Sequence, residues 1–148
     1  MTAMDDATFL RQFEDCSWPY AQWRHRAHLK VAYLYLRRFS LTEALPKVCA
    51  GIRAYNKSKN VAEGPTMGYH ETVTHAWVRL INVALQEHGP AETADAFLDR
   101  HPQLGQKEFL RTFYSPELLG SPRAKAEFVE PDLAPFPPGP SQSGPREL

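Results

Sequence analysis

The segment 68–87 constrains the fold of this chain most, because its apolar residues recur at the spacing of one helix face. That face contains His70, Val73, Trp77, Ile81, Ala84 and Leu85. Such spacing is typical of an amphipathic helix that buries one side. Gly89-Pro90 ends the pattern, since glycine suits a left-handed cap and proline cannot continue a helix. The first two turns of this predicted helix carry the polar run Tyr69-His70-Glu71-Thr72-Val73-Thr74-His75.

Other segments also have helical signals, and none shows the alternation of a strand. Asp5 or Asp6 can cap a first helix, which Pro19 ends, and a second is expected from Tyr20 or Gln22 to Phe39. A capping-box sequence starts a third helix at residues 40–43, with a kink or restart at Pro46. Further helices are expected over 91–100 and 104–114, followed by two short pieces that start at the Ser-Pro pairs 115–116 and 121–122. The pattern predicts an all-α, compact bundle of about five to six helices.

The length of 148 residues fits one domain with a core of its own. We expect this helical domain to span 1–136. Proline, serine and glycine dominate the remaining stretch, 137–148, and this composition predicts a disordered tail.

Charge and hydropathy exclude several classes of protein. The 17 basic residues balance 17 acidic ones and form no basic stripe, so nucleic acid is not an expected partner. No apolar run approaches the roughly 20 residues that span a bilayer, so no membrane segment is expected. The acidic start of the chain is unlike a secretory signal. Cys16 and Cys49 lack the spacing of a disulfide framework, and we expect reduced thiols in a cytoplasmic protein.

Two histidine-bearing helix starts are expected to meet in space. His25 and His28 are three residues apart in the first turn of the predicted second helix, on its inward face. Sequential helices joined by short loops tend to be antiparallel, so the second and fourth helices start at the same end of a bundle. This topology places His25 and His28 near His70 and Glu71.

A cluster of three imidazoles and one carboxylate favours a metal site. We expect His25, His28, His70 and Glu71 to be ligands of a divalent transition metal, with Fe, Zn, Mn and Ni as the candidates. Adjacent helix residues point about 100° apart, so Glu71 is either a ligand at the seam or a general base beside a ligand. Tyr69 and Thr74 can orient a bound substrate by hydrogen bonding, and with Glu71 they are the candidate catalytic residues.

Simpler explanations exist for the same residues. A histidine on an apolar helix face is often a core residue bonded to a neighbour, and an acidic residue at a helix start complements the helix dipole. His75 points with Glu71 either to the seam or to solvent, and Trp77 fits the core better than a cofactor site. His88 and His101 sit at helix ends, where the dipole favours a partly positive ring.

The sequence also resembles a family of small, largely uncharacterised bacterial all-helical proteins. The resemblance is carried by His25-Arg26-Ala27-His28-Leu29 together with Tyr69-His70-Glu71-Thr72-Val73-Thr74, and it extends over roughly residues 20–136. It implies a shared polar pocket built from His25, His28, His70 and Glu71. It implies no particular reaction.

These observations predict a metal-dependent enzyme that acts on a small-molecule substrate, either as an oxygenase or other oxidoreductase or as a hydrolase. Ser17 and Ser58 have no base nearby in the sequence and Cys16 has no clear activating partner, which favours the oxidative chemistry. The alternative is a non-enzymatic module that binds a small molecule or a protein, whose histidines form a buried hydrogen-bond network.

Overall fold

The computed structural model describes residues 5–137 of the chain. Over this range it forms seven α-helices and three 3₁₀ segments, and no strand; only an isolated bridge pairs Gly64 with Met67. The predicted all-α class is confirmed. The elements are α1 (Asp6–Glu14), η1 (Tyr20–Gln22), α2 (His25–Leu36), α3 (Leu41–Ser58), α4 (Glu71–His88), α5 (Ala94–Arg100), η2 (Pro102–Gly105), η3 (Lys107–Thr112), α6 (Pro116–Leu119) and α7 (Pro122–Ala126).

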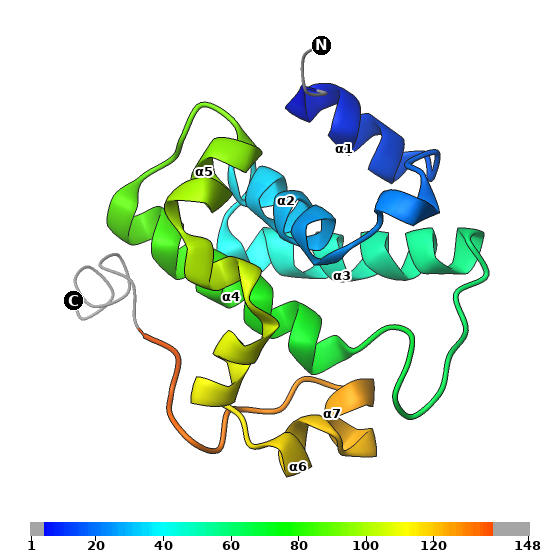
Figure 1. Ribbon diagram of the computed structural model, residues 1–148, viewed down its shortest axis with the longest axis vertical. Coiled ribbons are helices and arrows are strands. Elements are labelled where there is room, and N and C mark those ends of the chain that lie inside the picture. Colours follow the sequence, from blue (N-terminus) through cyan, green and yellow to red (C-terminus); the bar gives the residue numbers. More distant parts are fainter. Residues whose placement is uncertain (1–4, 138–148) are drawn as a thin grey trace.

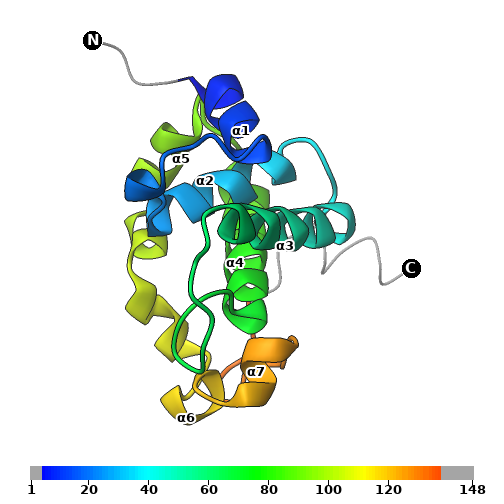
Figure 2. The ribbon, with the colours of Figure 1, turned by 90° about the vertical axis from the view of Figure 1, so that its right-hand side faces the viewer.

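Helices α2, α3 and α4 pack against one another and form the centre of the molecule (Figure 1). Helix α1 packs against α2 and α3, α5 packs against α2, and α7 packs against α4. In both ribbon views α1 lies at one end of the molecule and the short helices α6 and α7 lie at the other (Figure 2). The apolar side chains between these helices form one core cluster.

Most helix starts carry the side-chain caps that their sequences predict. Asp5 caps α1, and Ser40 with Glu43 forms a complete capping box at α3. Ser115 and Ser121 cap the two short helices, each followed by proline in the first turn. Helix α3 runs through Pro46 without a restart, although proline has no amide hydrogen to donate to the carbonyl four residues earlier.

Several elements differ from the prediction. Helix α2 begins at His25, since residues 20–22 form a separate 3₁₀ turn and Arg24 has extended backbone. Helix α5 begins at Ala94, where Thr93 caps it. The helix predicted over 104–114 is instead two 3₁₀ segments, because Gln106 between them has an extended backbone conformation.

The start of α4 differs in the way that matters most for the site. Gly68 has φ +88°, and an added Cβ there would lie 2.4 Å from the Glu63 carboxylate, so the chain turns sharply at this point. His70 is extended and serves as the N-cap, and the helix itself starts at Glu71 rather than at Gly68. His70 and Glu71 therefore do not share a regular helical turn.

Between residues 5 and 137, no helix combines the length and the apolar character that a membrane crossing requires. Of the predicted tail, 137–148, all but Pro137 lies outside the described residues.

Candidate functional site

A cavity of about 480 Å³ lies where the starts of α2 and α4 meet α3 and η3. We call it the histidine pocket, because His25, His28 and His70 all line it. The antiparallel order of the helices predicted this meeting of the three residues. The remaining lining residues are Trp23, Arg24, Ala32, Val48, Ile52, Asn56, Gly68, Tyr69, Val73, Thr74, Trp77, Val78, Lys107, Leu110, Arg111 and Leu119.

The ring of His28 is held by the main chain of its own helix. Its Nδ1 lies 2.8 Å from the carbonyl oxygen of Arg24. A carbonyl only accepts, so Nδ1 carries the hydrogen and Nε2 keeps a lone pair. The ring also packs on Trp23, with centroids 4.0 Å apart, and the indole nitrogen of Trp23 donates to Asn56. Burial, with smaller effects of His25 and Lys107, lowers the pKa of His28 to about 4. His28 is therefore neutral at pH 7.

His25 is fixed in the same manner against a different element. Its Nε2 donates to the carbonyl oxygen of Leu104 at 2.9 Å, which leaves the lone pair on Nδ1. The ring meets Trp77 edge-on, with centroids 4.8 Å apart. Burial lowers the pKa of His25, and the charge of Lys107 lowers it further.

Both ring nitrogens of His70 are occupied by the main chain. Nδ1 accepts from the backbone N–H of Val73 at 3.1 Å, which caps α4, and Nε2 donates to the carbonyl oxygen of Leu119 at 2.8 Å. Burial lowers the pKa of His70. The ring thus joins the start of α4 to the end of α6, and it has no lone pair to offer a metal ion.

The four side chains expected to be metal ligands do not converge in the structure. His70 uses both ring nitrogens for main-chain bonds, and Glu71 does not line the histidine pocket. Over residues 5–137 no three His, Cys, Asp or Glu side chains form a group that fits a metal ion. Only His25 and His28 keep a ring lone pair beside the pocket, fewer than the three protein ligands typical of a catalytic metal site. Metal binding itself stays a prediction.

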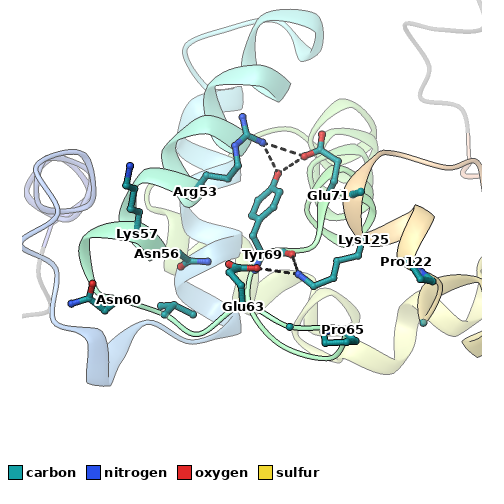
Figure 3. A pocket seen from close by; sticks show the side chains of 14 residues that line it. Arg53, Asn56, Lys57, Asn60, Glu63, Pro65, Tyr69, Glu71, Pro122 and Lys125 are labelled. Carbon is teal, nitrogen blue, oxygen red and sulfur yellow. Dashed lines mark hydrogen bonds and ion pairs between the residues drawn. The ribbon is translucent and has the colours of Figure 1, made fainter.

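Glu71 lies instead on a second, more open cavity of about 800 Å³ (Figure 3). We call it the outer groove; it is lined by Arg53, Asn56, Lys57, Asn60, Val61, Glu63, Gly64, Pro65, Tyr69, Glu71, Gly120, Pro122, Lys125 and Ala126. The hydroxyl of Tyr69 donates to Glu71 at 2.7 Å, and Arg53 pairs with the same carboxylate at 3.3 Å. Lys125 pairs with Glu63 at 3.2 Å.

The three predicted catalytic residues are therefore divided between the two cavities. Thr74 lines the histidine pocket, Glu71 lines the outer groove, and Tyr69 lines both. Burial and its contacts with Cys49 and Glu71 raise the pKa of Tyr69, so the phenol stays protonated. Burial also raises the pKa of the Cys49 thiol, which makes it a poor nucleophile at neutral pH.

The charge around the histidine pocket has one sign. Arg24, Lys107 and Arg111 line it, and all three are exposed at its rim. No aspartate or glutamate is among the lining residues of this cavity in the described chain. Because the histidines are neutral at pH 7, the pocket combines apolar and aromatic walls with a cationic rim.

Four of these residues were not predicted as part of a site. The sequence pattern favours the core for Trp77, and no motif singles out Trp23, Lys107 or Arg111 as site residues. A spacing of four residues would place Lys107 and Arg111 on one side of the α-helix that the sequence predicts, but the segment is a 3₁₀ helix, which repeats every three residues. What they face depends on how η3 packs. His75 lies outside both cavities and stacks on Phe128, with ring centroids 3.7 Å apart.

Comparisons with known proteins add nothing to this geometry. The chain matches no protein-family model. It matches no curated protein. It also matches no solved structure. The resemblance to bacterial helical proteins stays a prediction.

Proposed function

We propose that this chain is a small-molecule-binding protein whose ligand occupies the histidine pocket. The observation that carries the proposal is the pocket itself: about 480 Å³, with two indole walls and histidine rings oriented by main-chain bonds. Ligand sites are typically concave and mostly apolar, with a few placed polar groups, and this volume is in their usual range.

The polar groups of the pocket define how a ligand is oriented. His28 keeps the lone pair of Nε2, and His25 keeps that of Nδ1, so both rings can accept a hydrogen bond from a ligand. Each ring is already held by a carbonyl and an indole, so little side-chain freedom is lost on binding. The flat faces of Trp23 and Trp77 favour a planar, apolar ligand body.

Titration with two neutral planar probes, indole and 2-naphthol, tests the proposal. Binding of either probe is expected to shift the ring signals of His25 and His28 in NMR spectra and to leave those of His88 unchanged. Thr74→Phe places a bulky ring at the wall of the pocket and is expected to abolish binding. Thr42→Phe, at an exposed position of α3, is the matched control. Shifts that persist in Thr74→Phe would contradict the proposal.

The metal-dependent enzyme predicted from the sequence remains the competing proposal, because His25 and His28 both keep a lone pair beside the pocket. Metal analysis of untagged protein separates the two. The binding proposal expects no stoichiometric metal. Near-stoichiometric Fe, Zn, Mn or Ni that is lost in His28→Ala would favour the metalloenzyme. A reducing, cytoplasmic location is part of either proposal, because Cys16 and Cys49 are free thiols.

A further inference from the structure

The cationic side chains that line the histidine pocket have no carboxylate partner over residues 5–137, unlike several cations elsewhere in the molecule. Arg26 and Lys30 pair with Asp95, Arg53 pairs with Glu71, and Lys125 pairs with Glu63. Over residues 5–137 neither Lys107 nor Arg111 has a carboxylate within ion-pair distance. Their charges are thus available to a ligand.

Lys107, Leu110 and Arg111 line the pocket from η3, whereas His28 lines it from α2, and Trp23 and Arg24 from the turn before α2. Cations therefore lie on both sides of the pocket, but Arg24 also donates to the carbonyl of Ala21, whereas Lys107 and Arg111 stand together on η3. The charge of Lys107 reaches both His25 and His28 and lowers their pKa values. An anion bound beside η3 would relieve this unfavourable concentration of positive charge.

We infer that the ligand of the histidine pocket is an organic anion with a flat apolar body and one carboxylate group. The body lies against the indoles of Trp23 and Trp77, and the carboxylate lies at the rim beside Lys107 and Arg111. This inference rests on the proposed function and goes beyond it by naming the chemical class of the ligand. Arg111 can bind a carboxylate through two parallel hydrogen bonds, while Lys107 adds a point charge.

Pairs of probes that differ only in charge test the inference on the full chain. The pairs are benzoate and benzamide, 2-naphthoate and 2-naphthamide, and indole-3-acetate and indole-3-acetamide, titrated calorimetrically at pH 7.5 and low salt. In the pair that fits best, the carboxylate is expected to bind at least about tenfold tighter than the amide, which corresponds to about 1.4 kcal/mol. Added salt is expected to weaken binding of the carboxylate more than that of the amide.

Variants then locate the charge that is responsible. The double variant Lys107→Gln/Arg111→Gln is expected to reduce carboxylate affinity to the level of the amide and to leave amide affinity unchanged. Both positions are exposed, so the fold should persist, and far-UV circular dichroism checks it. Lys57→Gln, which removes a cation from the outer groove, is the matched control and should change neither affinity.

The outcomes separate this inference from the proposed function. If amides bind as tightly as carboxylates, or if the double variant retains the preference, the ligand is not an anion, although the pocket still binds small molecules. If none of the six probes, indole or 2-naphthol binds, the proposed function fails and the inference fails with it.

Discussion

The histidine pocket and the outer groove share Asn56 and Tyr69 in their walls, yet their polar groups are satisfied in different ways. In the outer groove the side chains bond one another, as Arg53 does with Glu71 and Lys125 with Glu63. In the histidine pocket the rings bond main-chain carbonyls, and the cations Lys107 and Arg111 bond no carboxylate of the described chain. The smaller cavity is the better candidate, because no carboxylate lines it, whereas Glu63 and Glu71 pair with two of the cations that line the outer groove.

Three consecutive residues at the start of α4 show how this difference arises. His70 caps the helix and turns to Leu119, Glu71 points into the outer groove, and Thr72 is fully buried against the segment after α7. Each side chain therefore has its own environment, although the three are neighbours in the sequence. Substitution of each residue measures how much its environment contributes.

The largest effect is expected from Thr72→Val. The Thr72 hydroxyl donates to the carbonyl of Glu127 at 2.9 Å and accepts from the N–H of Val129 at 3.1 Å. Valine has nearly the same shape but leaves both main-chain groups without a partner, so the free energy of unfolding should fall by about 3 kcal/mol. Urea denaturation measures it. Thr74→Val, which faces the histidine pocket, is the control and should cost less than about 1 kcal/mol. Equal losses would contradict this assignment.

A smaller loss is expected from His70→Ala. This substitution removes the N-cap of α4 and the donor to Leu119, and together these should lower the free energy of unfolding by about 2 kcal/mol. His70→Asn keeps a capping side chain and should recover about half of the loss. If His70→Ala is as stable as the wild type, the ring does not hold α4 to α6.

The pH dependence of stability tests the neutral state of the half-buried His28 ring. Its pKa is about 4 in the folded chain and 6.5 when unperturbed, so the unfolded chain binds more protons between these values. Stability should be complete above pH 6.5 and fall as the pH decreases towards 4. Other histidines also have lowered pKa values, but they affect the pH dependence of stability in the same way in the wild type and in a variant that lacks only His28.

Comparison with His28→Gln isolates the contribution of His28. Between pH 7 and pH 4.5 the wild type should lose between about 1 and 2 kcal/mol more than the variant does, since each pKa unit corresponds to about 1.4 kcal/mol and water in the cavity reduces the full effect. Urea titrations at several pH values give this difference. Parallel pH profiles for the two proteins would show that the fold does not favour the neutral ring of His28.

The smallest effect is expected from Glu71→Gln. Its partner Arg53 is about half exposed, and exposed ion pairs contribute little, so the free energy of unfolding should change by less than about 1 kcal/mol. Affinity of the histidine pocket for its ligand should stay the same. A large loss of binding in Glu71→Gln would show that the two cavities act as one site and would end the contrast between them.

Local signals in the sequence determined much of this protein. The capping residues Asp5, Ser40, Ser115 and Ser121 predicted where helices begin, because a cap acts on amide hydrogens within three residues of itself. Helical periodicity predicted the all-α class, and the order of the helices predicted that His25, His28 and His70 share a cavity. These inferences need only short-range geometry and a simple topology.

Only the tertiary structure decided what those residues do. The use of both His70 nitrogens depends on Leu119, 49 residues later, and the cationic rim depends on how η3 packs beside α2. The position of Glu71 depends on the turn at Gly68, which makes His70 a cap rather than a residue within the helix. These hydrogen bonds and cavity walls join atoms that are far apart in the sequence and that only the packing of the helices brings together. They could therefore not be predicted from residue spacing alone.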